Sequence, residues 1–173
     1  MAFSLKAIIR AFAAPDHRIN CRSAPWRKLT QELDRRGARK HEAGAFLLGT
    51  KSGDIRDVTE FVFYDELDPA AYSTGVCVLH AAAFSKLWTI CREKALTVVA
   101  DVHTHPGDAF QSHSDRTNPM VAREGHIAII IPNFSAPPVD LTKVGIFEYR
   151  GSHEWHDRSA SRVGRYLYTG FWS

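Results

Sequence analysis

Apolar residues recur along this chain with a helical period in two segments. The first, at about residues 25–36, places large apolar side chains on one face, those of Trp26, Leu29 and Leu33. Ser23 is expected to cap this helix and Gly37 to end it. The second segment, at about residues 80–94, has apolar residues at the i, i+3, i+4 and i+7 positions, namely Phe84, Leu87, Trp88 and Cys91. Both segments predict amphipathic helices that cover a core.

Other apolar runs are short and rich in β-branched and aromatic residues. They predict strands at residues 45–50, 58–64, 96–103, 127–131, 144–149 and 154–156. Lys51-Ser52-Gly53-Asp54 has the composition of a hairpin turn between the first two strands, and Gly151-Ser152 that of a turn between the last two. Residues 65–75 are expected to form a loop, and Asn118 and Pro119 to begin a short helix that Gly125 closes. This order of elements predicts an α/β or α+β sandwich.

The composition excludes several classes of protein. Of the 173 residues, 45% are hydrophobic and 24% are charged, which is typical of one globular domain spanning residues 1–173. The net charge of +3 is too small to favour nucleic acid or a membrane as a partner. The 3 cysteines are odd in number and show no CxxC pairing, and no segment has the pattern of a signal peptide or a membrane span. A cytoplasmic protein is expected.

The chemically informative segment lies at the end of the central predicted strand. His103 and His105 are two residues apart, so both side chains leave the strand on the same face. Pro106 ends the strand, and Asp115, ten residues after His105, is available as a third ligand. Two histidines and one carboxylate can bind zinc and leave a fourth position open, as catalytic rather than structural zinc sites do.

Two further side chains are expected near the same point. Ser112 is three residues before Asp115, so one turn of helix-like backbone would place both near the ion. Glu42 stands at the start of another predicted strand. If that strand is the neighbour of the one that ends at His103, the Glu42 carboxylate can accept a proton from water and deliver it to a leaving amine.

In their order these residues resemble the JAMM (MPN-plus) zinc metallopeptidases, in particular bacterial members associated with ubiquitin-like conjugation. The resemblance covers about residues 25–147 and excludes the aromatic tail at residues 160–173. The matching residues are Glu42, Gly44 with Leu47-Leu48-Gly49, His103-Thr104-His105-Pro106, and Ser112-His113-Ser114-Asp115. The resemblance implies the MPN fold, a curved mixed β-sheet packed between helices and related to cytidine deaminases. It also implies one Zn²⁺ per chain bound by His103, His105 and Asp115, with Glu42 as general base and acid and Ser112 stabilising the oxyanion.

One spacing departs from the family pattern. Residues 106–111 separate His105 from Ser112, which is one residue fewer than the family usually has. Counting one residue further would place His113 and Arg116 in the serine and aspartate roles, which is chemically worse. We therefore expect a one-residue deletion in this loop.

The resemblance implies a peptidase that hydrolyses the amide after the C-terminal tail of a ubiquitin or ubiquitin-like protein, by deconjugation or by precursor processing. The compact chain is similar to bacterial members that accompany E1-like and E2-like proteins, so removal of a ubiquitin-like modifier in an antiphage pathway is the preferred hypothesis. Two alternatives are a noncatalytic MPN-type scaffold that binds partners and a JAMM peptidase that acts on a sulfur-carrier fusion. The RadC-like proteins share a similar His-x-His-Pro pattern, but the small charge excess does not favour a DNA-linked function.

The remaining polar groups have simpler interpretations. Asp101 either faces the ion as a partner of its ligands or binds only backbone. The basic residues 35–40 are expected at a solvated helix end, and the aromatic tail is expected to dock onto the core. An exposed polar edge is expected for a second group of possible ligands, His153, Glu154, His156 and Asp157. Candidate contacts for a substrate tail are the loops at residues 65–75 and 132–139.

Overall fold

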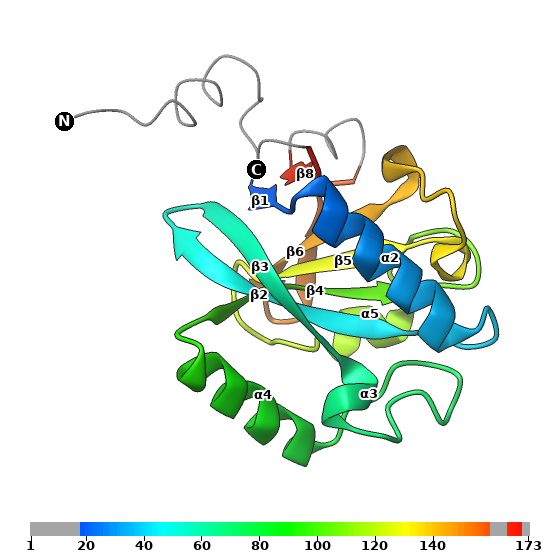
Figure 1. Ribbon diagram of the computed structural model, residues 1–173, viewed down its shortest axis with the longest axis horizontal. Coiled ribbons are helices and arrows are strands. Elements are labelled where there is room, and N and C mark those ends of the chain that lie inside the picture. The colour runs from blue at the N-terminus through cyan, green and yellow to red at the C-terminus, as the bar shows by residue number, and fades with distance from the viewer. Residues whose placement is uncertain (1–17, 160–165, 171–173) are drawn as a thin grey trace.

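The computed structural model describes residues 18–159 and 166–170 (Figure 1). Its strands are β1 (Ile19–Asn20), β2 (Gly44–Ser52), β3 (Ile55–Phe63), β4 (Thr97–Thr104), β5 (Ile127–Ile131), β6 (Gly145–Gly151), β7 (Glu154–Asp157) and β8 (Leu167–Tyr168). They form one 8-stranded mixed sheet in the order β7-β6-β5-β4-β2-β3-β1-β8. The helices are α2 (Ser23–Gly37), α3 (Tyr64–Leu67), α4 (Ala81–Glu93) and α5 (His113–Thr117), with 3-10 turns η1 (Asn133–Ser135) and η2 (Leu141–Lys143).

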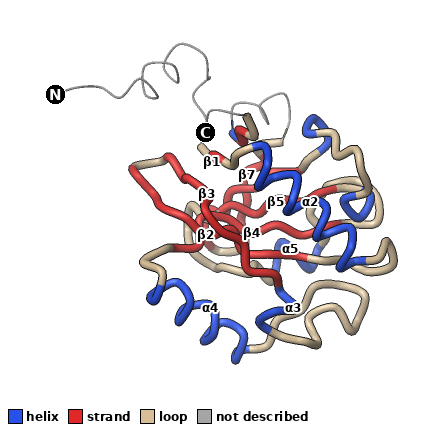
Figure 2. Tube along the Cα trace, viewed as in Figure 1, coloured by secondary structure: helices blue, strands red, loops and turns tan. Residues whose placement is uncertain are grey.

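The sheet is curled, and helices pack on both of its faces (Figure 2). Successive side chains of a strand point to opposite faces, and β2 shows what this does to the core. Ala45 and Leu47 belong to the cluster beneath α2, whereas Phe46 and Leu48 belong to the cluster beneath α4. The predicted mixed α/β fold with a curved mixed sheet between helices is therefore confirmed at this level.

The register of β4 with its neighbours positions the candidate site. β4 runs antiparallel to β2, with His103 opposite Gly44, and parallel to β5, with His103 opposite Ile130. The start of β2 consequently lies beside the end of β4. This meets the condition under which Glu42 was expected to reach the histidines.

The two long helices and both hairpins agree with the sequence-based expectations, with small corrections. β2 pairs antiparallel with β3, and β6 pairs antiparallel with β7. The N-cap of α2 is Arg22 rather than Ser23, and the Arg22 side chain makes no capping hydrogen bond to the helix. On α4 the predicted core position Cys91 is 7% exposed, but Trp88 is 40% exposed. Within the described part of the chain, no helix combines the length and apolar character needed to cross a bilayer.

The prediction that a helix starts at Asn118 was wrong. The helix in this region is α5, which ends just before Asn118. Asn118 is the C-cap of α5, and its backbone N–H donates to the Ser114 carbonyl at 2.8 Å. Pro119 then follows the helix end, where proline is common because it cannot continue a helix. Asn-Pro thus marks a helix end here rather than a helix start. The loop predicted at residues 65–75 likewise begins later, because α3 occupies its first residues.

Of the basic residues at the end of α2, Arg35 and Arg39 are exposed as expected, with side chains 65% and 59% exposed, but Arg36 is not. The Arg36 side chain is only 13% exposed, and it forms ion pairs with Asp65 and with Glu66. Its guanidinium also lies 4.0 Å from the centroid of the Phe63 ring. Arg36 therefore fastens the end of α2 to α3.

Part of the aromatic C-terminal tail docks onto the sheet as predicted. Leu167 is 1% exposed, and β8 pairs parallel with β1 at the sheet edge. Tyr166 packs against the core cluster beneath α2. The tail residues Phe171 and Trp172 lie outside the described residues.

Candidate metal centre

Two histidine side chains at the end of β4 face each other. His103 lies in the strand and His105 just beyond it, so the alternation of the chain sends both rings to the same face. Their Nε2 atoms are 3.0 Å apart, and the two residues are 6% and 5% exposed. The His105 N–H donates to the Ile131 carbonyl on β5, which fixes the backbone beyond the strand. The backbone that carries the two imidazoles is therefore held in place by its hydrogen bonds to β5.

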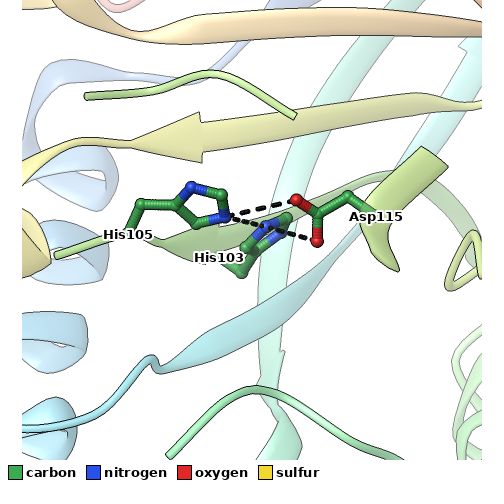
Figure 3. Close-up of side chains that lie close together, drawn as sticks. All are labelled: His103, His105 and Asp115. Atoms are coloured by element: carbon green, nitrogen blue, oxygen red, sulfur yellow. Dashed lines mark hydrogen bonds and ion pairs between the residues drawn. The ribbon is translucent and has the colours of Figure 1, made fainter. Parts of the chain in front are cut away.

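Asp115 brings a carboxylate to the same point from α5 (Figure 3). Its Oδ1 is 3.4 Å from His103 Nε2, and its Oδ2 is 3.4 Å from His105 Nε2. Ser112 is the N-cap of α5 and exchanges hydrogen bonds with Asp115. The shorter loop between His105 and Ser112 is thus compatible with the predicted ligand set.

The three ligand atoms have the spacing that a small metal ion requires. They lie within 4.8 Å of one another, and the two Nε2 atoms, which are 3.0 Å apart, each lie 3.4 Å from a different oxygen of the Asp115 carboxylate. A tetrahedral zinc ion with bonds of about 2.0–2.1 Å to nitrogen would separate its ligand atoms by about 3.3 Å. Two imidazole nitrogens and one carboxylate oxygen also form a donor set that suits zinc or iron. The residues present therefore fit a metal cofactor.

The electrostatics of the group favour positive charge at its centre. Burial alone would raise the pKa of Asp115, but the imidazoles of His103 and His105 outweigh it and hold the pKa well below its usual value. Burial alone would lower the pKa of His103, but the carboxylates of Asp101 and Asp115 outweigh it and raise the pKa to about 10. A cation bound among these groups would satisfy the same carboxylates.

Glu42 lies beside the three ligand atoms. Its Oε1 is 3.8 Å from His105 Nε2, which is beyond hydrogen-bond distance. Its Oε2 accepts the Cys77 N–H at 3.2 Å, and its own N–H donates to the Gly75 carbonyl at 3.0 Å. The loop that follows α3 therefore holds this carboxylate next to the metal-binding group without engaging Oε1.

Comparisons with known proteins found one named relative that bears on this geometry. No protein-family model matches the chain. The chain is 27% identical over 136 residues to a Sinorhizobium fredii protein named as the probable metalloprotease y4jG, and the match covers 76% of this chain and 81% of that protein. The name of this relative indicates a metalloprotease, which is consistent with the candidate metal site formed by His103, His105 and Asp115.

Two solved structures share the fold. Protein DSY2949 from Desulfitobacterium hafniense matches with a TM-score of 0.61 at 14% identity, covering 87% of this chain and 93% of that chain. A Salinibacter ruber protein matches with a TM-score of 0.50 at 20% identity, covering 77% of this chain and 86% of that chain. At these identities the likeness concerns the arrangement of the sheet and helices alone.

A pocket of about 100 Å³ opens over the metal-binding group, and its lining includes Glu42, His103, Ser112 and Asp115. Cys77 lines it too, but burial, followed by the charges of Glu42 and Asp101, raises the pKa of its thiol well above the usual value. This thiol stays protonated and is a poor nucleophile. Cys77 is therefore not a candidate for catalysis, and the candidates in the pocket are the metal-binding group and the Glu42 carboxylate.

Two residues that the sequence did not point to, Cys77 and His126, contact this region. The backbone N–H of Cys77 holds Glu42, and the His126 side chain bonds the buried Asp101 carboxylate at 2.6 Å. Asp101 is therefore held by side chains and not only by backbone. No local pattern in the sequence marks His126 as a partner of Asp101, because the two residues are 25 apart along the chain and meet through the parallel pairing of β4 with β5.

The second group of possible ligands stays apart from this centre. His153, Glu154 and Asp157 are exposed residues of the β6–β7 hairpin, as predicted. They line a larger depression of about 580 Å³. This depression shares Gln111 and Trp155 with the pocket over the metal-binding group, so the two hollows adjoin.

Proposed function

We propose that this chain is a zinc-dependent peptidase of the JAMM (MPN-plus) type that hydrolyses the amide after the C-terminal tail of a ubiquitin or ubiquitin-like protein. One observation carries the proposal: the Glu42 carboxylate lies 3.8 Å from His105 Nε2, beside three converging ligand atoms, in one pocket. A metal-binding group with a separate carboxylate next to it suits metal-assisted hydrolysis. The likeness to a probable metalloprotease supports the same class of activity.

The chemistry divides among the residues of the pocket. His103, His105 and Asp115 would hold the ion, and zinc in such a site supplies Lewis-acid chemistry that polarises a carbonyl and makes water more acidic. Glu42 accepts a proton from the attacking water and delivers it to the leaving amine. Ser112 Oγ accepts the Asp115 N–H, and its own O–H can still donate to the oxygen that gains charge.

The shape of the pocket supports an extended tail that ends in small residues. A volume of about 100 Å³ leaves room beside Glu42 for backbone and little side chain. Val76 and Val78, which line the pocket, are 49% and 42% exposed, and Phe110 is 63% exposed with its ring centroid 6.0 Å from that of His105. Exposed apolar groups at the mouth of a narrow pocket favour apolar residues in the tail and glycine at the scissile bond.

The adjoining depression has room for more of the substrate. Its volume of about 580 Å³ suits the polypeptide on one side of the scissile bond. Trp155 forms part of both hollows and is held in place, because its Nε1–H donates to the Arg116 carbonyl at 3.1 Å. The proposal places the substrate chain along Trp155 and across both hollows.

The biological setting in this proposal is removal of a ubiquitin-like modifier alongside E1-like and E2-like proteins, in a bacterial antiphage pathway. Its support is the resemblance of the motif to bacterial JAMM proteins. Two alternatives, a peptidase that acts on a sulfur-carrier fusion and a noncatalytic scaffold, predict other outcomes of the experiment described next.

Metal content and cleavage of two probes test the proposal together. The probes are ubiquitin and a bacterial ubiquitin-like protein, each joined through its C-terminal glycine to aminomethylcoumarin. We expect about one zinc per chain and zinc-dependent cleavage. Glu42→Gln should retain zinc and lose at least about 100-fold in rate, because a general base contributes about 10²–10⁴. His156→Gln, a change of an exposed histidine on β7, should alter neither.

The two readouts separate the alternatives. No zinc in the wild type, even when zinc is offered back, would remove the catalytic proposal and favour a scaffold. Zinc without cleavage of either probe would overturn the ubiquitin-like substrate class and direct the search to sulfur-carrier fusions. Full cleavage by Glu42→Gln would contradict the role given to this carboxylate.

A further inference from the structure

One nitrogen of His103 faces the metal-binding group and the other faces a buried carboxylate. Nε2 is the atom 3.0 Å from His105 and 3.4 Å from Asp115. Nδ1 is buried and has no hydrogen-bond partner within the described residues. The Asp101 Oδ2 atom lies 4.0 Å from this Nδ1.

Asp101 is itself held by two groups from other elements. It is 2% exposed, and a carboxylate so far from water is costly unless it is paired and hydrogen-bonded. His126 Nε2 lies 2.6 Å from Asp101 Oδ1, and the Tyr64 hydroxyl donates to Oδ2 at 3.3 Å. His126 and Tyr64 are 3% and 0% exposed, so the whole chain of contacts is buried.

The sheet fixes the position of each member of this chain of contacts. Asp101 and His103 alternate on one face of β4, two residues apart. β5 runs parallel to β4 with Ala128 opposite Asp101, so His126 lies at the beginning of the neighbouring strand. The His126 carbonyl accepts the Tyr149 N–H of β6 at 2.8 Å, which ties its backbone to a third strand.

We propose that Asp101 and His126 are positioning residues for His103: His126 orients the Asp101 carboxylate, and this carboxylate accepts the His103 Nδ1–H, leaving Nε2 to bind the ion. The inference rests on the metal assignment of the proposed function. A metal-binding histidine commonly donates its second N–H to a carboxylate, which fixes the ring and its tautomer. The Nδ1 to Oδ2 distance of 4.0 Å must shorten by about 1 Å to give this hydrogen bond.

The affinity of the full chain for Zn²⁺, measured by competition with a chromogenic chelator, tests this role. His126→Leu removes the donor to Asp101 and is expected to weaken zinc binding about 10–100-fold, the usual effect of losing such a supporting group. His126→Gln keeps an N–H at a similar reach and should recover most of the affinity. His156→Gln is the matched control, with no expected change. Thermal unfolding in chelator establishes that each variant is folded.

A measurement on the wild type makes the inference independent of any variant that fails to fold. Proton–nitrogen correlation spectra of the zinc-loaded chain report which imidazole nitrogen carries the proton. We expect the proton of His103 on Nδ1. A proton on Nε2, or a folded His126→Leu with unchanged zinc affinity, overturns the positioning role and leaves the proposed function standing. A wild-type chain that binds no zinc refutes the proposed function itself.

Discussion

Ser112 and Asp115 hold each other at the start of α5: the Asp115 N–H donates to Ser112 Oγ at 3.2 Å, and the Ser112 N–H donates to Asp115 Oδ2 at 2.7 Å. The residue that caps the helix therefore also orients a candidate metal ligand. Ser112→Ala removes the side-chain acceptor and should lower the free energy of unfolding by about 1 kcal/mol. It should also weaken zinc binding, because the turn that carries Asp115 is loosened. Urea unfolding and chelator competition measure the two effects.

Threonine can cap a helix through the same hydroxyl, so Ser112→Thr should restore both quantities. A different result would separate the two roles of Ser112. If Ser112→Ala keeps its stability and zinc affinity but loses cleavage, the hydroxyl acts on the substrate oxygen and the cap contributes nothing measurable.

Zinc should stabilise the folded chain, since its ligands come together only when the end of β4 lies beside α5. An ion that binds the folded state alone adds about 2.7 kcal/mol at a free concentration of 100 times its Kd. Thermal unfolding with zinc should therefore occur at a higher temperature than unfolding in chelator. Asp115→Ala should remove this difference while His156→Gln retains it. Equal unfolding temperatures with and without zinc in the wild type would contradict a metal at this site.

Features set by short stretches of chain were the ones that sequence reasoning could predict. The two-residue spacing of His103 and His105 on a buried strand determines that their rings share a face, whatever surrounds them. The hairpins and the two long helices follow from local periodicity and turn residues in the same way. Asp115 could be selected because its distance along the chain from His105 is close to that of a known motif.

Contacts between distant segments were beyond such reasoning. His126 reaches Asp101 across 25 residues, and a lone histidine before a strand carries no sign of its partner. The group on Cys77 that binds Glu42 is a backbone N–H, which every residue except proline possesses. The Asn118-Pro119 pair was misread because the same residues suit a helix start and a helix end.

Gly44 gives the Tyr64 ring the space it occupies beneath the candidate site. A Cβ at this position would lie 2.2 Å from Tyr64 Cε2, and Tyr64 is fully buried. Gly44→Ala should therefore destabilise the fold by about 1–3 kcal/mol, as overpacking of a core does. Urea unfolding is the measurement. Gly107→Ala, where a Cβ meets nothing within 4 Å, is the matched control and should change stability by less than about 0.5 kcal/mol.

Equal stabilities of the two glycine variants would contradict this reason for glycine at position 44. If Gly44→Ala is destabilised, Tyr64→Leu in the same chain should recover part of the loss, because leucine lacks the ring atoms that the new Cβ meets. The Tyr64 hydroxyl also donates to Asp101, so the recovery should be incomplete.

Asp68 joins the two ends of the loop that holds Glu42. Its Oδ2 contacts the His80 ring at 2.6 Å and accepts the His80 N–H at 3.1 Å, while its Oδ1 accepts the Ala70 N–H at 3.0 Å. The bond with the His80 side chain, followed by those with the two backbone N–H groups, lowers the pKa of Asp68 from 3.8 to about 2. Because the folded pKa is the lower one, the stabilisation is complete above about pH 4 and is lost as the pH falls toward 2.

Asp68→Ala should consequently loosen the loop at neutral pH and release the Cys77 N–H from Glu42. Faster hydrogen exchange of the Cys77 amide would show this, and an NMR titration of the wild type would give the Asp68 pKa. Asp140→Ala removes a similar carboxylate from the start of η2, where it accepts the Thr142 N–H at 2.9 Å, and should leave Cys77 unaffected. Unchanged exchange at Cys77 in Asp68→Ala would mean that other bonds hold the loop, such as that from the Val78 N–H to the Ala71 carbonyl at 2.9 Å.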